Sequence, residues 1–374
     1  MVRLVGVLLG ASLLLGSCAI STEEARETAS GNSGEGDGGQ AEGNDGGSND
    51  GDADSGSQAS TGSPSVTDES NATGSNGTAA GPDLRAALSA DVLEDEPAQP
   101  RPTPAAAPNG RRAPLPAATA AEVVEQIVTA ERGLRDPDAT AGELADFGHL
   151  QQVAYRILGR NDDWDTEVFA SLPEDVTRSA ELHLAARRGL RGLSSGYDAA
   201  EIIPAWEIIE PEPPASLLAH YAEAQALTGI DWEYLAAINL IETGMGRIRG
   251  LSSAGAQGPM QFIPTTWDEV GEGDVNDPHD AIIAAARYLV RRGGPDDMES
   301  ALWGYNISDH YVEVVSTYAQ LLREDPGAFT GIYNWEIWFW TAEGDVWLPV
   351  GIRNDEVVPL DEFLFAAPWA QPGK

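Results

Sequence analysis

The chain has 374 residues, of which 60 are acidic and 22 are basic, so its formal net charge is −38. Nucleic-acid binding depends on clusters of basic side chains that neutralise phosphates, and this charge balance excludes it. Cys18 is the only cysteine, so no disulfide can form within the chain.

The first residues carry the pattern of an export signal. Residues 4–15 are mostly apolar, follow Arg3 and lead into Leu15-Gly16-Ser17-Cys18. An apolar run of this length is too short to span a bilayer as a helix, and its small-residue exit is typical of a cleaved signal. Because the last four residues resemble a bacterial lipobox, we expect residues 1–18 to be a lipoprotein signal with Cys18 lipidated. The alternative is a plain secretory signal. The mature protein is then lipid-anchored to the cell membrane, outside the cytoplasm.

A long segment of small and polar residues follows the signal. Residues 19–116 are rich in Gly, Ser, Asn, Asp, Ala and Pro, with few aromatic or large aliphatic side chains. Such a composition cannot bury enough apolar area to offset the entropy of ordering the chain. We therefore predict a disordered acidic stalk over residues 19–116.

The folded part is predicted to begin with helices. Residues 117–200 carry apolar side chains at three- and four-residue steps, which favours a helical unit. Its last helix, from about Pro173 to Leu190, has Arg187, Arg188 and Arg191 near its end, where cations suit the helix dipole. No motif in this unit indicates a chemistry, so its role stays open.

A second helical unit, residues 205–327, contains a carboxyl group in an unusual place. Asp231 is a candidate N-cap for a helix over residues 232–243, and Glu242 shares a stripe with Leu235 and Ile238. A carboxyl group on a core-facing stripe is desolvated, which raises its pKa and suits a general acid. The alternative is a Glu242 that turns to solvent or pairs with Arg247 or Arg249.

The loop after this helix is irregular but carries apolar side chains. Residues 252–267 contain two glycines and two prolines together with Met, Phe, Ile and Trp residues. Because solvent-exposed loops avoid large apolar side chains, we expect this loop to line a site. Residues 271–277 lack the alternating acidic ligands and distal Glu of an EF-hand, so no metal site is predicted.

Two more helices follow the loop. Asp277 is a candidate N-cap, with Pro278 at the first helical position. The next helix places Tyr305 on an inward-facing stripe, and Asn306 stands at its exit. A buried phenol requires a hydrogen-bond partner.

These motifs together resemble the catalytic core of the lytic transglycosylases that cleave peptidoglycan. The resemblance rests on Ile241-Glu242-Thr243, Ser252, the string from Gly255 to Trp267 and the stretch from Ala301 to Asn306. It covers about a third of the chain, residues 205–322, and is similar to the membrane-bound lytic transglycosylase B branch. It implies a mainly α, lysozyme-like catalytic domain that acts on peptidoglycan glycan strands without a cofactor or metal.

The resemblance also implies roles for individual residues. Glu242 is implied as the catalytic acid and base, and Tyr305 as the phenol that orients it. The groove near the scissile bond is implied to be lined by Ser252, Met260, Gln261, Phe262 and Asn306. In the family, the protonated Glu gives its proton to the oxygen between MurNAc and GlcNAc, and the C6 hydroxyl closes on C1 to form 1,6-anhydroMurNAc.

Two other functions stay open at this point. A hydrolytic muramidase shares the helical core, and a non-catalytic lipoprotein would hold glycan without cutting it. Residues 328–374 form a Trp-rich extension, predicted as a small hairpin that packs on the helices; a sugar-stacking platform is the alternative.

Overall fold

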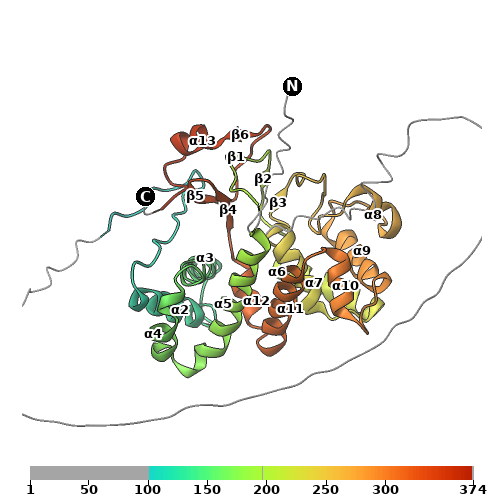
Figure 1. The fold of residues 1–374 in the computed structure, drawn as a ribbon, viewed down its shortest axis with the longest axis horizontal. Coiled ribbons are helices and arrows are strands. Elements are labelled where there is room, and N and C mark those ends of the chain that lie inside the picture. Colours follow the sequence, from blue (N-terminus) through green and yellow to red (C-terminus); the bar gives the residue numbers. More distant parts are fainter. Residues whose placement is uncertain (1–100, 196, 373–374) are drawn as a thin grey trace, which may run out of the picture. The chain divides into compact units, whose positions relative to one another are not determined.

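The computed structural model describes residues 101–195 and 197–372, which are mainly helical, as the sequence predicts (Figure 1). The predicted signal, Cys18 and residues 19–100 lie outside the described residues. Among the described helices, none combines the length and the apolar character required to cross a bilayer.

The first group of helices comes from the segment before residue 195. Thr140 caps the N-terminus of one of its helices with a capping box, in which Thr140 and Glu143 exchange side-chain and backbone hydrogen bonds. The group consists of α2 (Ala120–Gly133), α3 (Ala141–Leu158), η1 (Asp162–Trp164), α4 (Asp165–Ser171) and α5 (Glu174–Ser194).

The second group contains the helices that carry the candidate site. Asp277 caps one of them by accepting a hydrogen bond from Asp280 N, with Pro278 at its first position, as predicted. The group consists of α6 (Pro214–Thr228), α7 (Trp232–Thr243), α8 (Pro264–Val270), α9 (Pro278–Arg291), α10 (Met298–Tyr305), α11 (Asp309–Glu324) and α12 (Ala328–Tyr333).

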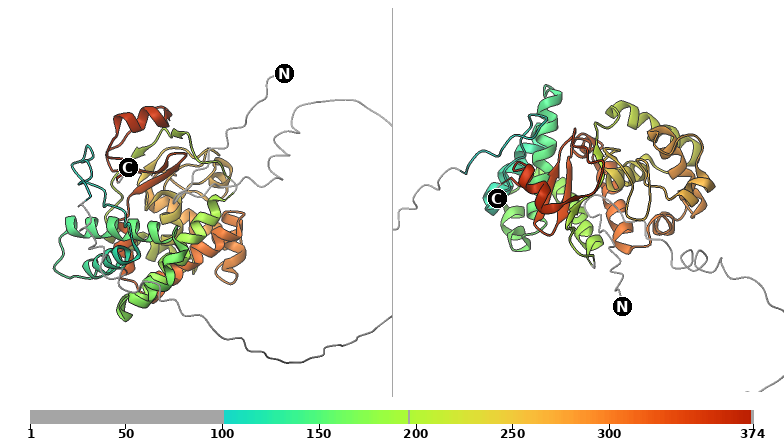
Figure 2. Two further views of the ribbon diagram at one scale, coloured as in Figure 1. Left: turned by 60° about the vertical axis from the view of Figure 1, so that its left-hand side comes forward. Right: turned by 90° about the horizontal axis from the view of Figure 1, so that it is seen from above.

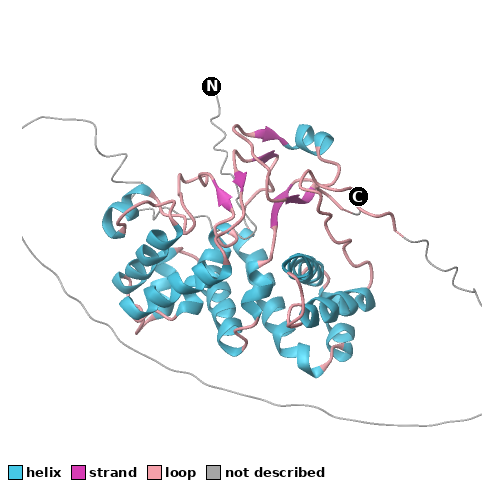
Figure 3. Cartoon of the chain, turned by 180° about the vertical axis from the view of Figure 1, so that it is seen from behind, coloured by secondary structure: helices cyan, strands magenta, loops and turns pink. Residues whose placement is uncertain are grey.

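The strands are short, antiparallel and gathered on one side of the helices (Figure 3). The predicted C-terminal hairpin is confirmed: β4 (Ile337–Thr341) pairs with β5 (Gly344–Leu348), with Trp338 opposite Trp347. The other pairs join distant segments: β1 (Ile202–Ile203) with β6 (Val358–Pro359), and β2 (Glu207–Ile208) with β3 (Ile248–Arg249). The chain then forms α13 (Leu360–Ala366).

The hairpin contacts both groups of helices, and it lies between them when seen from above (Figure 2). Trp338 Nε1 donates to His149 Nε2 of α3 over 3.2 Å, whereas Ile337 lies against Gly244 at the end of α7. Trp335 and Trp338 are each 5% exposed, so the packing interpretation of the Trp-rich extension is confirmed for these two residues.

The hydrophobic core crosses the three predicted segments. A single cluster of buried side chains includes Leu190 of α5, Leu240 of α7 and Trp347 of β5. A smaller cluster lies among α2, α3, α4 and α5. The helices of the site therefore pack against segments that precede them and segments that follow them in the sequence.

The prediction of a disordered stalk is wrong for residues 101–116. Ala107 and Ala113 are buried, and Asn109 Nδ2 donates to Val350 O over 3.2 Å. Arg111 forms ion pairs with Asp146 and with buried Glu336. Small side chains and fixed proline angles let this extended segment pack closely, although its composition resembles that of a disordered chain.

Candidate active site

Helix α7 places Glu242 on its last turn, deep in the core. Its residues are buried without interruption from Leu235 to Thr243. The helix ends at Gly244, whose φ is 62° and whose missing Cβ would lie 2.6 Å from Ile337 Cδ1. Only glycine combines this left-handed backbone with so close a neighbour. The strand of the hairpin therefore fixes where the helix stops, and with it the position of Glu242.

The start of α7 differs from the prediction. Asp231 occupies the N-cap position, but its side chain makes no capping hydrogen bond. Its carboxylate lies 3.3 Å from the Arg323 guanidinium of α11 instead. The acidic residue thus joins two helices through a surface ion pair.

The Glu242 carboxyl group is 1% exposed and has one hydrogen-bond donor. Tyr311 OH donates to Oε1 over 2.8 Å, and Oε2 makes no hydrogen bond among the described residues. Burial raises the pKa of Glu242 to about 8, although the hydrogen bond from Tyr311 opposes this rise. The raised pKa favours the protonated carboxyl group at neutral pH, which is the form that a general acid requires.

The alternative arrangement of Glu242 is wrong. Arg247 does not pair with the carboxyl group: it donates to Gly244 O over 3.1 Å, and its guanidinium lies 5.5 Å from the centre of the Tyr333 ring. Arg249 is exposed. Without a basic partner, nothing offsets the desolvation of Glu242 except the phenol of Tyr311.

The phenol that donates to Glu242 is that of Tyr311, whereas the family resemblance implies this orienting role for Tyr305. Tyr305 OH donates to Met260 O over 2.8 Å. The two rings stack, with centroids 6.2 Å apart and an interplanar angle of 6°. Tyr311 lies at the start of α11, where Val314, Val315 and Tyr318 follow on the same buried face. That three- and four-residue spacing is the signal that would have found it.

Side chains of α7 hold the loop that follows this helix through hydrogen bonds. Pro259 O accepts from Asn239 Nδ2 over 2.9 Å and from Thr243 Oγ1 over 2.6 Å. Gly258, with φ 76°, lets the loop pass Val275, because a Cβ there would lie 1.9 Å from Val275 O. The backbone beside Glu242 is therefore held by α7 itself.

The predicted groove residues have different surroundings. Gln261 has φ 51° and donates through Nε2 to Gly258 O over 2.9 Å. Ser252 Oγ accepts from the backbone of Ala254 and Ala256, so this hydroxyl shapes its own loop. Buried side chains belong to Met260, Gln261, Phe262 and Asn306. The Phe262 ring packs against Trp267, Tyr288 and Tyr305. Their contacts with glycan stay a prediction.

A cavity of about 260 Å³ lies beside the end of α7. Met245 and Gly246 of the helix exit and Gly258 and Pro259 of the loop belong to its lining. So do Glu210 and Glu212, two carboxyl groups outside the motif that the sequence does not indicate. They lie in a Glu-Pro-Glu-Pro stretch without periodicity. Glu212 Oε2 is 2.8 Å from His220 Nε2.

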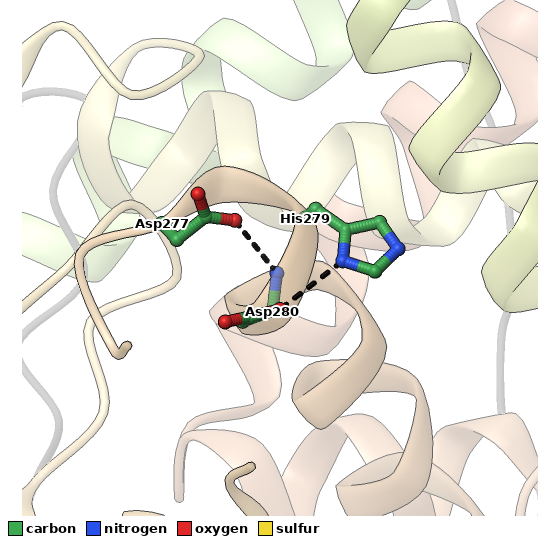
Figure 4. A group of neighbouring side chains, drawn as sticks. All are labelled: Asp277, His279 and Asp280. Carbon is green, nitrogen blue, oxygen red and sulfur yellow. Dashed lines mark hydrogen bonds and ion pairs between the residues drawn. The ribbon is translucent and has the colours of Figure 1, made fainter. Parts of the chain in front are cut away.

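One group of side chains has the ligand types of a cation site. Asp277, His279 and Asp280 have atoms within 4.8 Å of one another (Figure 4). Asp277 accepts from Asp280 N over 3.2 Å, Asp280 accepts from Asp274 N over 3.0 Å, and His279 Nε2 lies 3.2 Å from Glu223. Helix capping and ion pairing account for this arrangement without a cation.

Comparisons with known proteins point to the same region. Residues 220–320 match the family model described as "Transglycosylase SLT domain". The chain is 32% identical over 130 residues to the membrane-bound lytic murein transglycosylase F of Thiobacillus denitrificans, which covers 33% of this chain and 27% of that relative. It is 31% identical over 120 residues to the protein of the same name from Methylobacillus flagellatus, with 30% and 25% covered.

A third protein of that name, from Nitrosospira multiformis, is 29% identical over 121 residues, with 30% and 25% covered. The chain thus spans about a quarter of the length of the curated relatives it matches. No solved structure matches it significantly. These relatives bear the F designation, and the resemblance to the B branch stays a prediction. The matched segment, residues 220–320, contains Glu242, Tyr305 and Tyr311, so the candidate site lies in the part of the chain that is similar to the transglycosylase SLT family.

Proposed function

We propose that the protein is a peptidoglycan lytic transglycosylase that cleaves the β-1,4 bond between MurNAc and GlcNAc. The observation that carries the proposal is the buried, protonated Glu242 carboxyl group inside the segment that matches the SLT family model. The relatives are named lytic murein transglycosylases, which supports the same substrate class.

Glu242 serves first as the acid and then as the base. The proton of the carboxyl group moves to the glycosidic oxygen as the bond to C1 of MurNAc breaks, and positive charge develops at C1. Tyr311 OH stabilises the carboxylate that remains by donating to Oε1. The carboxylate then takes the proton of the C6 hydroxyl while that oxygen bonds to C1. The products are 1,6-anhydroMurNAc and a free GlcNAc hydroxyl end.

The C6 hydroxyl is favoured over water because it is already part of the bound sugar. Intramolecular nucleophiles that are well oriented reach effective molarities of about 10⁵ M or more. The acidic residues that follow the loop, Asp268, Glu269 and Glu272, are exposed, and Arg291 and Arg287 pair with the last two. None of these three is placed to activate a water beside the buried Glu242.

A hydrolytic muramidase is the second candidate, and Glu210 and Glu212 favour it. Both carboxyl groups line the cavity at the end of α7, where Met245 and Gly246 follow Glu242 by three and four residues, and a general base for water is the role that a muramidase would give to one of them. A transglycosylase requires no such base. The two candidates therefore differ in the product and in their dependence on these side chains.

The test is digestion of purified sacculi in heavy-oxygen water, followed by mass spectrometry of the fragments. We expect ends in anhydroMurNAc, without label, and the same products from a Glu210→Gln, Glu212→Gln double variant. Labelled reducing ends that vanish in the double variant would establish the muramidase. Retention on sacculi with no released fragments, in both the parent and Glu242→Gln, would establish a binding protein instead.

We also propose that Cys18 carries a lipid anchor. The support is the sequence Leu15-Gly16-Ser17-Cys18 after an apolar run, together with relatives that are named membrane-bound. The parent should fractionate with membranes, and Cys18→Ala should not, with Ser17→Ala as a control that keeps the thiol. A Cys18→Ala protein that stays in the membrane fraction would contradict the anchor.

A further inference from the structure

A second cavity, of about 510 Å³, lies outside the SLT domain, between α5 and the C-terminal hairpin. Its lining is unusual for so acidic a protein, because it contains three arginines and one acidic residue. The lining consists of Arg160, Arg187, Leu190, Arg191, Ser194, Ser195, Trp340, Gly344 and Asp345.

Asp345 is already engaged by two arginines. Its Oδ2 accepts from Arg156 and Arg160. Burial raises the pKa of Asp345, but the nearby guanidinium groups of Arg156, Arg160 and Arg187 outweigh it and hold the pKa at about 2. Arg191 donates to the backbone carbonyl of Gly159 at the end of α3. The only carboxylate among the described residues of the lining thus takes its direct contacts from arginines other than Arg187.

Arg187 has no carboxylate in direct contact. It is 6% exposed, its Nε makes no hydrogen bond, and its guanidinium forms no ion pair within 4.0 Å among the described residues, although Asp345 attracts it from a greater distance. A buried cation without a contacting anion costs several kcal/mol in a folded protein. A cavity that a guanidinium lines in this way is suited to an anion.

The other lining residues define what kind of anion fits. Leu190 and the half-buried Trp340 ring supply an apolar wall. The Ser194 and Ser195 hydroxyls donate to the backbone carbonyls of Leu190 and Gly192, so the arginines are the donors left for an anion. A cavity of this volume suits an organic ligand rather than a lone inorganic ion. Planar guanidinium groups bind carboxylates through paired hydrogen bonds.

We propose that this cavity binds a short peptide through its carboxylate groups, with Arg187 as the principal contact and Trp340 against the peptide's apolar part. If the proposed function holds, the peptides attached to murein are ligands of this chemistry, and that identification alone rests on it. The cavity would then hold the peptide part of the polymer while the SLT domain acts on the glycan part.

Binding is measured by calorimetry with the Glu242→Gln protein, so that the result does not depend on catalysis. The probes are the tripeptide alanyl-glutamyl-alanine, the uncharged alanyl-glutaminyl-alanine amide, and inorganic phosphate. We expect saturable binding of the acidic tripeptide at one site, with the amide and phosphate at least tenfold weaker.

Two variants and a control locate the binding. Arg187→Gln should weaken it by about tenfold to a hundredfold, the range for charge-assisted hydrogen bonds. Ser195→Glu adds a carboxylate at an exposed position of the lining, keeps every buried group, and should abolish binding even if Arg187→Gln folds poorly. Arg353→Gln removes an exposed arginine outside the cavity and should leave binding unchanged.

Three results would overturn the proposal: no binding of the acidic tripeptide, equal binding by the Ser195→Glu protein, or phosphate binding as tight as that of the tripeptide. Digestion of sacculi by the parent protein is recorded separately. A protein that digests sacculi but does not bind the tripeptide would refute the peptide site and leave the proposed function intact.

Discussion

Two opposing effects, burial and a hydrogen bond, set the pKa of Glu242. Burial by the core disfavours the carboxylate, and the Tyr311 phenol favours it, with burial the larger effect. The folded protein holds this proton up to a pH of about 8, whereas the unfolded chain releases it near pH 4.5. Stability from this group is therefore fully present below pH 4.5 and is lost as the pH rises through 8.

Glu242→Gln tests this sign directly. Glutamine stays neutral, so the variant should match the parent in free energy of unfolding at pH 4 and exceed it at pH 8, by a few kcal/mol in order of magnitude. Its activity on sacculi should fall by about 10² to 10⁴. Urea unfolding at the two pH values gives the difference, with exposed Glu299→Gln as the control. Parallel pH profiles would mean an ordinary pKa for Glu242.

Tyr311→Phe and Tyr305→Phe separate the two stacked phenols. Loss of the Tyr311 hydrogen bond should raise the pKa of Glu242 further, so the alkaline limb of the activity profile should move to higher pH. The rate should also fall by about tenfold to a hundredfold, because the carboxylate formed by proton transfer loses a donor. Tyr305→Phe should leave the limb in place. The reverse result would restore the assignment made from the sequence.

For single residues, the sequence predicts which side chains are buried better than it predicts which side chains form hydrogen bonds with one another. The stripe of Leu235, Ile238 and Glu242 predicts the burial of Glu242 correctly, although the helix is buried on all its faces from Leu235 to Thr243 and not on that stripe alone. Two inward-facing phenols, Tyr305 and Tyr311, lie on consecutive helices, and the one that reaches Oε1 depends on how α10 and α11 pack. The sequence does not indicate that Glu210 and Glu212 line a cavity, because they lie in a stretch without helical or strand periodicity.

Helices α5 and α11 pack closely enough to exclude a methyl group at one position. A Cβ on Gly189 would lie 2.5 Å from Val314 Cγ2, whereas a Cβ on Gly142 in α3 meets no atom within 4 Å. Gly189→Ala should therefore lower the free energy of unfolding by about 1–3 kcal/mol. Gly142→Ala should raise it by about 0.5–1 kcal/mol, because alanine favours helix. Denaturant midpoints of both variants check the pair. A stable Gly189→Ala protein would show that the two helices can separate slightly.

Composition decides which elements can be read from the sequence. The β4–β5 hairpin is rich in Trp and β-branched residues, and it was predicted. Residues 101–116 share their Ala and Pro content with a disordered segment, and they pack through distant contacts such as the ion pair of Arg111 with Glu336, 225 positions away. Contacts of that sequence separation leave no local pattern.

Across the whole molecule, the core joins segments that family comparison divides. Leu190, Leu240 and Trp347 share one cluster although only Leu240 lies in the SLT domain. A fragment of residues 205–327 would expose the faces that α5 and the hairpin cover. We expect it to lack a cooperative thermal transition by circular dichroism, while residues 101–374 unfold in one. Cooperative unfolding of the short fragment would establish the predicted domain boundaries.

Helix α7, which is buried from Leu235 to Thr243, should open to solvent more rarely than the segments around it. Its amide hydrogens should exchange with solvent only when the whole core opens, whereas the largely exposed α8, which follows the loop, opens locally. The catalytic carboxyl group proposed here is therefore carried by a segment that should open only together with the fold itself.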